Sequence, residues 1–341
     1  SSIQTQETIS SIQIEPTVVP TSTALPASSE TVSLSTIQIF ITSSVQTQET
    51  ISSIQIEPTV VPTSTALSST AATPSSTSSP NSGSIVPRQL TYSPYNDDNT
   101  CKDYSSIYAD LTFIKGKGIN SIRMYGVDCG SIGTVQTAAS ALGLTISQGF
   151  YITSAGVDSI DADVDNIISW AGKNGWSIFT DFIVGNEAII NGWVSADQLI
   201  GKINSIRSKF QTAGYSGYIS TAEPPNIYHE NPALCNNLDF IGINAHAYFD
   251  PNSSAATAGE FLASQIVVTK KFCPGKTVYV TETGYPSAGI QNGNNIPSVE
   301  NQAIAIKSII NVVGTDLTLF TLYNDFWKSP GPYGVEQYFG L

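Results

Sequence analysis

The stretch Asp181–Glu187 reads D-F-I-V-G-N-E, an apolar run that ends in a Gly-Asn-Glu turn. A short run of β-forming residues closed by glycine is typical of a buried strand followed by a loop. The stretch Val278–Ser287 reads V-Y-V-T-E-T-G-Y-P-S and has the same form. Both sequences predict a strand with a glutamate at its carboxyl end.

Six similar runs lie around these two, and amphipathic helical stretches alternate with them. This alternation predicts a parallel sheet covered by helices, and eight units in about 250 residues match an α/β fold of the (β/α)8 TIM-barrel type. A doubly wound open sheet is the alternative, but no G-x-G-x-x-G or P-loop sequence follows any strand. The predicted strands are Leu90–Pro94, Ile119–Tyr125, Leu144–Phe150, Ile178–Val184, Gly217–Ala222, Phe240–Ala245, Thr277–Thr281 and Leu317–Tyr323, and the clearest helices are Tyr104–Lys115, Ser195–Gly214 and Val299–Val313.

The first 88 residues have a different composition. They are rich in Ser, Thr and Pro, contain one aromatic residue, and repeat the segment Ser1–Leu25 almost unchanged as Ser43–Leu67. Such a sequence cannot bury a core and predicts a disordered, O-glycosylated stalk. Alternating Ile and Val within the repeat leave a small folded adhesive module as the alternative. We therefore expect a stalk over 1–88 and a barrel over 89–341.

The charge balance excludes several classes of partner. The chain carries 14 Lys+Arg and 27 Asp+Glu, a net charge of −13, which disfavours nucleic acid and anionic membrane surfaces. No apolar run approaches the ~18–20 residues of a membrane-spanning helix. The chain opens at Ser1 without a leader sequence, which we interpret as processing, and the stalk favours secretion.

The four cysteines fall at two ends of the predicted barrel. Cys101 and Cys129 follow the first and second strands, whereas Cys235 and Cys273 precede the sixth and seventh. Because a disulfide requires neighbouring Cα atoms, we predict the bonds Cys101–Cys129 and Cys235–Cys273. Asn252 begins the single N-x-S/T sequon and is the candidate glycosylation site.

Glu187 and Glu282 lie at the ends of the fourth and seventh predicted strands. The active site of a β/α barrel lies at the carboxyl ends of its strands. Two carboxylates there suit glycoside cleavage, in which one protonates the leaving oxygen and the other attacks the anomeric carbon. The alternative is a pair of ordinary solvated carboxylates, which are common on protein surfaces.

The pair V-G-N-E and T-E-T-G-Y-P-S resembles the signature of glycoside hydrolase family 17, the β-1,3-glucanase family. Its fungal cell-wall branch is the more similar, through Y-S-P-Y, S-I-R-M-Y-G-V-D-C, F-W-K and E-Q-Y-F-G, over about Leu90–Leu341. The resemblance implies that Glu187 is the acid/base and Glu282 the nucleophile of a retaining mechanism. It also implies that Asn186 binds the sugar hydroxyl beside the reacting carbon. No cofactor is expected.

Other polar and aromatic residues near strand ends are candidate sugar contacts, because pyranose faces pack on rings while hydroxyls bind polar groups. Arg123 has the alternative role of an ion-pair partner beneath the site, and His246 that of a hydrogen-bonded wall residue. The other histidine, His229, is interpreted as a loop residue. The spacing of His and Cys residues does not indicate a metal site. The candidates are Tyr92, Arg123, Tyr125, His246, Tyr248, Tyr285, Tyr323 and Trp327, followed by Glu223, Asp325 and Phe326.

The expected function is that of a secreted, monomeric enzyme that remodels β-1,3-glucan in the fungal cell wall. Hydrolysis and glucanosyl transfer both remain open, because the choice depends on acceptor sites in the loops. The alternatives are a glucan-binding mannoprotein or adhesin without activity and a β-glycosidase of another specificity.

Overall fold

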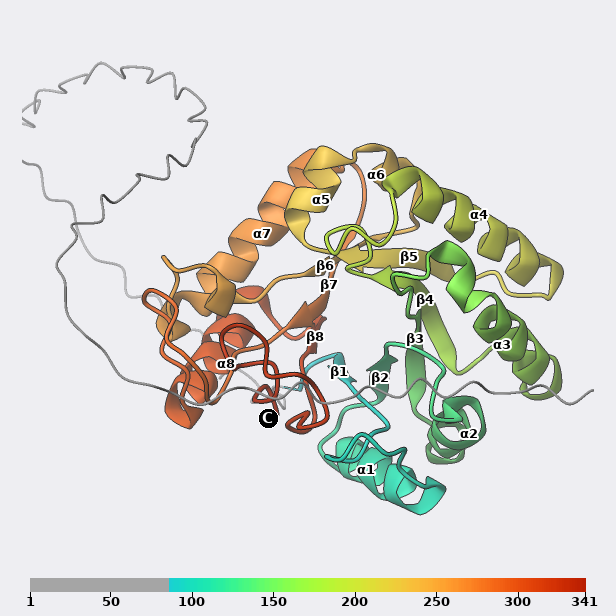
Figure 1. Ribbon diagram of the computed structural model, residues 1–341, viewed down its shortest axis with the longest axis horizontal. Coiled ribbons are helices and arrows are strands. Elements are labelled where there is room, and N and C mark those ends of the chain that lie inside the picture. Colours follow the sequence, from blue (N-terminus) through green and yellow to red (C-terminus); the bar gives the residue numbers. More distant parts are fainter. Residues whose placement is uncertain (1–85) are drawn as a thin grey trace, which may run out of the picture. The chain divides into compact units, whose positions relative to one another are not determined.

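Eight parallel strands form a closed barrel in the computed structural model, which describes residues 86–341 (Figure 1). They pair in chain order, and β8 pairs with β1 to close the ring. The TIM-barrel prediction is confirmed, while the predicted stalk lies outside the described residues except for its last three positions. The strands are β1 (Gln89–Thr91), β2 (Ser121–Met124), β3 (Thr145–Phe150), β4 (Phe179–Asn186), β5 (Tyr218–Glu223), β6 (Ile241–Asn244), β7 (Val278–Thr283) and β8 (Leu317–Leu319).

Helices surround the barrel (Figure 1). Each connection between consecutive strands contains at least one helix, as parallel pairing requires of a crossover. Within residues 86–341, no helix combines the length and apolar character needed to cross a membrane. The α-helices are α1 (Tyr104–Gly116), α2 (Ser131–Leu142), α3 (Asp161–Asn174), α4 (Ala196–Thr212), α5 (Pro225–Glu230), α6 (Ala233–Asn237), α7 (Ala258–Phe272) and α8 (Val299–Val313), and the short 3-10 helices are η1 (Val157–Ile160), η2 (Ala247–Phe249) and η3 (Ala255–Thr257).

Helix α4 shows how the sequence pattern produces the outer layer. Ser195 caps it by accepting a hydrogen bond from the Gln198 backbone, and the Gln198 side chain accepts one from the Ser195 backbone. This capping box satisfies two amide groups that the helix itself leaves unpaired. The buried apolar residues of this helix, Leu199, Ile203, Ile206 and Phe210, recur every three or four positions and so form one stripe that faces the sheet.

Most strands end one to four residues from their predicted ends, and two of these differences bear on the site. Strand β4 extends beyond its predicted end to Asn186. Strand β8 ends at Leu319 instead of continuing to Tyr323. Beyond that end, the backbone amide of Thr321 donates to the carbonyl of Phe339, in the C-terminal segment. The amides of Phe320 and Leu322 still donate to the ends of the neighbouring strands, at the carbonyls of Thr283 and Thr91.

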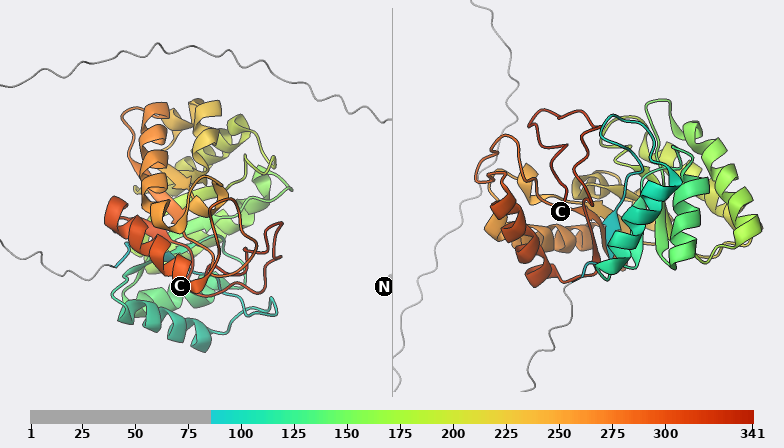
Figure 2. Two further views of the ribbon diagram at one scale, coloured as in Figure 1. Left: turned by 90° about the vertical axis from the view of Figure 1, so that its left-hand side faces the viewer. Right: turned by 90° about the horizontal axis from the view of Figure 1, so that it is seen from below.

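Both predicted disulfides are present. Cys101–Cys129 joins the segments after β1 and β2, and Cys235–Cys273 joins α6 to the end of α7, each with 5.3 Å between Cα atoms. The first bond therefore lies at the carboxyl ends of the strands and the second at the opposite end of the barrel. The loop after β1 and the segment after β8 lie side by side over the carboxyl ends (Figure 2, right).

Candidate active site

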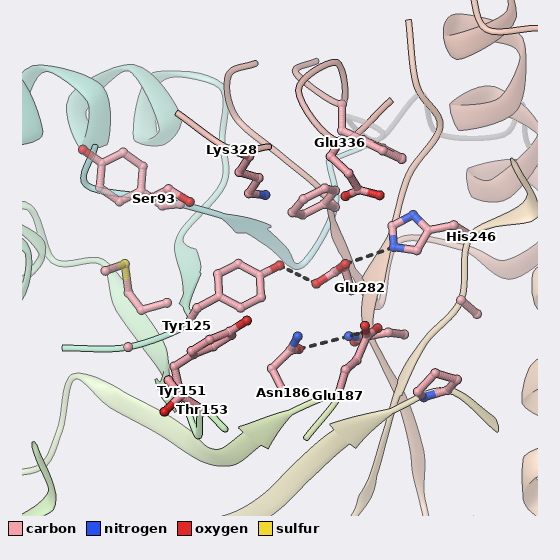
Figure 3. Close-up of a pocket in the computed structure, with 18 of the residues that line it drawn as sticks. Ser93, Tyr125, Tyr151, Thr153, Asn186, Glu187, His246, Glu282, Lys328 and Glu336 are labelled. Carbon is pink, nitrogen blue, oxygen red and sulfur yellow. Dashed lines mark hydrogen bonds and ion pairs between the residues drawn. The ribbon is translucent and has the colours of Figure 1, made fainter. Parts of the chain in front are cut away.

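The carboxyl ends of the strands and their loops enclose a cavity of about 1190 Å³ (Figure 3). Glu187, directly after β4, and Glu282, within β7, both line it. This is the end at which β/α barrels bind their ligands. Much of the wall is aromatic: Tyr92, Tyr95, Tyr125, Tyr151, Phe249, Phe261, Phe320, Trp327 and Phe339.

Three side chains hold the Glu282 carboxylate. Arg123, which is 1% exposed, donates from Nη1 to Oε2 over 3.1 Å, and the hydroxyl of Tyr125 donates to the same oxygen. His246 Nε2 lies 3.0 Å from the other oxygen, Oε1. Figure 3 shows Tyr125 and His246 on opposite sides of the carboxylate. The carboxylate plane is therefore fixed from both sides.

These contacts set the charge of Glu282. Burial alone raises the pKa of a carboxyl group, because it disfavours the charged form. The hydrogen bond and charge of His246, the charge of Arg123 and the hydrogen bond of Tyr125 outweigh burial, and the pKa of Glu282 falls to about 2. Glu282 is therefore ionised near neutral pH.

The pKa of His246 moves in the opposite direction. Burial lowers the pKa of its imidazole, but the hydrogen bond and the charge of Glu282, with the charge of Glu187, raise it by more. The ring also packs edge-on against Phe320 and Phe339, at centroid distances of 5.8 and 5.4 Å. His246 is thus a rigid donor with a stabilised positive charge beside Glu282.

Glu187 has a left-handed backbone, with φ of 53°. Such a conformation costs a non-glycine residue about 1–2 kcal/mol, and it follows a register irregularity between β4 and β5. The Glu187 amide donates to the carbonyl of Ala222 over 2.8 Å. Its carboxylate accepts one hydrogen bond, from Asn244 Nδ2 to Oε1 over 3.0 Å. The local distortion turns the side chain into the cavity (Figure 3).

The environment of Glu187 favours its neutral form. Burial is the largest cause of its raised pKa, and the negative charge of Glu282 adds to it. The single hydrogen bond from Asn244 and the charges of His246 and Arg123 oppose this rise without cancelling it. The cavity therefore holds one ionised carboxylate and one carboxyl group that retains its proton to higher pH.

Asn186 is oriented by donors behind it. Arg123 Nη2 donates to its Oδ1 over 2.7 Å, and Asn244 Nδ2 donates to the same oxygen over 3.0 Å. Because an arginine can only donate, the atom facing it must be the amide oxygen. The amide NH2 of Asn186 is then free to donate to a ligand in the cavity.

Glu223, predicted to lie in the barrel mouth, is fully buried and does not line the cavity. It accepts hydrogen bonds from the backbone amides of Ile189 over 2.7 Å and Ile190 over 3.3 Å. Burial is the main cause that raises the pKa of Glu223 to about 7, although these amides oppose it. Glu223 thus fixes the turn that follows Glu187.

The structure places the other predicted sugar contacts at different distances from the cavity. Tyr92, Tyr125, His246 and Trp327 line the cavity together with Asn186. Arg123 lies behind the site, in the ion-pair role that the sequence left as the alternative.

Tyr248 and Tyr285 are corrections to the prediction. Both are fully buried and neither lines the cavity. The hydroxyl of Tyr248 donates to the carbonyl of Ile290 over 2.6 Å, and Tyr285 packs against Tyr248 with 6.2 Å between ring centroids. These rings support the loop after β7 from beneath.

Three further candidates lie beyond the cavity. Tyr323 and Asp325 line a smaller hollow next to it, and Phe326 is half exposed and lines neither. Asn252, the sequon residue, is exposed on the loop between η2 and η3.

Several lining residues were not predicted. Asn244, the last residue of β6, accepts a hydrogen bond from Thr281 and donates to both Asn186 and Glu187. Because Asn244 lies near the end of a predicted strand, the sequence could have indicated it as a lining residue. Tyr151, directly after β3, could have been found in the same way. Lys328, Glu336, Phe320 and Phe339 also line the cavity, from the segment after β8.

No group of three or more His, Cys, Asp or Glu side chains within residues 86–341 is arranged to hold a metal ion.

Residues 90–340 match the family described as the BtgE/BtgC glycoside hydrolase domain. They are also similar to the "Probable family 17 glucosidase SCW10" of Saccharomyces cerevisiae, with 39% identity over 254 residues, which is 74% of this chain and 64% of that protein. The chain belongs to glycoside hydrolase family 17. Within it, the "Probable beta-glucosidase btgE" of Aspergillus fumigatus is 42% identical over 252 residues. That match covers 74% of this chain but 44% of the relative, so the chain spans less than half of that protein.

Among solved structures, the family 17 β-1,3-glucanosyltransferase of Rhizomucor miehei has a TM-score of 0.65 and 25% identity, covering 76% of this chain and 93% of that one. The β-1,3-glucanase of Cryptomeria japonica pollen has a TM-score of 0.58 at 18% identity, over 75% of this chain and 95% of that one, a likeness of fold.

Proposed function

We propose that this family 17 chain is a retaining enzyme that cleaves β-1,3-glucan, with Glu187 as acid/base and Glu282 as nucleophile. The observation that carries the proposal is the asymmetry of the two carboxyl groups in one cavity. Glu282 is held ionised by Arg123, Tyr125 and His246, whereas burial and the charge of Glu282 raise the pKa of Glu187. Retaining cleavage requires one ionised carboxylate as nucleophile and one protonated carboxyl group as acid.

In the first step, the ionised oxygen of Glu282 attacks the anomeric carbon, and the bond between that carbon and the glycosidic oxygen breaks. Glu187 gives its proton to the departing oxygen, so the shortened chain leaves with a new hydroxyl group. A covalent ester joins the glycosyl unit to Glu282. Arg123 and Tyr125 then contact an ester oxygen in place of a carboxylate.

In the second step, Glu187 acts as a base. It takes a proton from water or from a sugar hydroxyl, and the resulting oxygen attacks the anomeric carbon and releases Glu282. Two inversions restore the original configuration. The free NH2 group of Asn186 lies beside Glu187 and is placed to bind the hydroxyl next to the reacting carbon.

The acceptor in the second step decides between hydrolysis and glucanosyl transfer. The Rhizomucor miehei relative is named as a glucanosyltransferase. We propose the same reaction here alongside hydrolysis, because the cavity of about 1190 Å³ has room for an acceptor sugar beside the glycosyl unit. Product sizing on laminari-oligosaccharides tests this: products longer than the substrate mean transfer, and only shorter products mean hydrolysis.

A glucan-binding module without activity is the second candidate function. Glu282→Gln distinguishes the two, because it keeps the shape of the side chain and removes the attacking charge. Loss of activity on laminarin with retained binding supports the enzyme. Unchanged activity in this variant refutes the assignment.

We further propose that the protein is secreted to the fungal cell wall, where it works as a monomer, with residues 1–88 as a spacer and Asn252 glycosylated. Two disulfides favour an oxidising compartment, and Asn252 is accessible. Mass measurement of the secreted protein before and after removal of N-linked glycans tests the modification at Asn252.

A further inference from the structure

A second hollow of about 480 Å³ adjoins the cavity, between the loop after β1 and the segment after β8. Figure 2 shows these two segments side by side in the right-hand view. Tyr92, Ser93 and Tyr95 line both the hollow and the cavity. The ring of Tyr95 packs on Trp327 of the cavity wall, with 4.4 Å between centroids. A chain molecule that leaves the cavity over Tyr95 can therefore enter the hollow directly.

Tyr323 presents a fixed ring in this hollow. Its hydroxyl donates to Asp110 Oδ1 over 3.1 Å, and Lys102 Nζ lies 4.9 Å from its ring centroid. Lys102 is itself paired with Asp110 over 2.8 Å. Tyr323 is nevertheless 43% exposed. An aromatic face that is held in place before binding loses little side-chain entropy when a sugar packs on it.

The polar lining suits a neutral ligand rich in hydroxyl groups. Asn96, Asp97 and Asp98 line one side of the hollow, and Asn324 lies on the other. Carboxylates and amides accept hydrogen bonds from hydroxyls, whereas the acidic lining repels anionic chains. The single basic residue of the lining, Lys102, is occupied by Asp110.

The loop that carries these residues is tied down. Cys101 is bonded to Cys129, the amide of Asn96 donates to the carbonyl of Thr100 over 2.8 Å, and that of Lys102 donates to the carbonyl of Pro94 over 2.9 Å. The hollow is thus formed before a ligand arrives.

The position of the hollow also indicates which end of a bound glucan chain it would contact. Glu187 must contact the leaving oxygen, so the leaving part of the substrate lies toward the loops after β4 and β5. The hollow lies beyond Trp327 and Tyr95, next to β8 and β1. We propose that this hollow is a distal binding site for neutral glucosyl units of the donor chain on the non-leaving side, with Tyr323 as its stacking platform. This inference rests on the proposed function.

The test is a direct binding measurement. The full chain carrying Glu282→Gln is titrated calorimetrically with laminari-oligosaccharides of three to eight units. We expect affinity to rise by about tenfold once the chain is long enough to reach Tyr323, a gain of the size expected for one stacking contact with its hydrogen bonds. Adding Tyr323→Ala should remove most of this gain and leave the affinity for the trisaccharide unchanged.

Two control variants sharpen the result. Tyr323→Phe keeps the ring and should keep most of the gain. Tyr218→Ala removes a tyrosine that is 61% exposed at the start of β5, at the opposite end of the barrel, and should change nothing. The proposal is overturned by no gain with chain length, by a gain that survives Tyr323→Ala, or by an equal loss for the trisaccharide. Failure of the proposed function is read separately, as absence of wild-type activity on laminarin.

Discussion

His246 and Glu282 face each other across 3.0 Å, from Nε2 to Oε1, in the wall of the cavity. The other carboxylate oxygen is held by Arg123 and Tyr125. Among residues 86–341, His246 is the one donor to Oε1, so this contact determines how strongly that oxygen's charge is stabilised.

Replacing His246 should move the acidic limb of the pH profile. Without the imidazole, His246→Gln loses a charged partner and the pKa of Glu282 rises from its value of about 2. Activity requires ionised Glu282, so it should then be lost at a higher pH as the solution is acidified. We also expect kcat to fall by roughly tenfold to a hundredfold, as for loss of a hydrogen bond to a charged group. An acidic limb at the wild-type pH in this variant would contradict the assigned role.

Removing the proton donor should change the alkaline limb. Activity of the wild type should fall as pH rises through the raised pKa of Glu187, because the leaving oxygen then lacks a proton. Glu187→Gln should lower kcat on laminarin by roughly 10²–10⁴-fold and abolish that limb. Measurement of kcat from pH 4 to 9 checks both. A variant with the full alkaline limb would show that another group supplies the proton.

The turn after Glu187 should depend on Glu223. Glu223→Ala removes the acceptor of the Ile189 and Ile190 amides, and we expect this loss to cost about 1–3 kcal/mol of unfolding free energy. Because the same turn aims Glu187, kcat should fall while KM changes little. Urea unfolding and steady-state kinetics measure the two effects. Glu230→Ala, at an exposed position, is the matched control. If Glu223→Ala lowers stability alone, Glu223 does not position Glu187.

The two disulfides should differ in their effect on function. Either double Cys→Ser variant should lose about 2–4 kcal/mol of stability. Loss of Cys101–Cys129 should also raise KM for long glucans, because this bond ties down the loop that borders the cavity and the hollow. Loss of Cys235–Cys273, at the opposite end, should leave KM unchanged. Melting temperatures and KM values are measured for both variants. Equal changes in KM would show that Cys101–Cys129 has no local role at the cavity.

The barrel could be predicted because strand and helix periodicities alternate clearly along the chain. Glu187, Glu282 and Asn186 could be predicted for a related reason, since each follows or ends an apolar run. The predictions were wrong where tertiary contacts determine whether a side chain is buried or lines the cavity. Tyr285 follows Glu282 closely in sequence, yet its ring is buried beneath the loop, and no periodicity indicates which way a loop residue turns.

Helix α8 shows the same limit. Ile304 is apolar, yet it is 47% exposed. The buried face instead includes Gln302, whose side chain donates to the carbonyls of Tyr285 and Gly340, each over 3.0 Å. A polar residue is buried there because its partners come from distant parts of the chain. The hydrogen bonds that define the charge of Glu282 likewise come from β2 and from the segment after β6, so sequence alone could name the carboxylate but not its state.

In the proposed mechanism, ionised Glu282 forms a covalent bond to the sugar while Glu187 gives and later takes back a proton. The most direct test of this mechanism is to incubate the protein with a 2-deoxy-2-fluoro-laminaribiosyl fluoride, whose glycosyl-enzyme ester breaks down slowly, and to map the modified peptide by mass spectrometry. We predict the added mass of one 2-deoxy-2-fluoro-laminaribiosyl unit, with fluoride released, on the Glu282 side chain of its peptide. The proposed mechanism would be contradicted if the protein lost activity without gaining a sugar adduct, or if the adduct lay on Glu187.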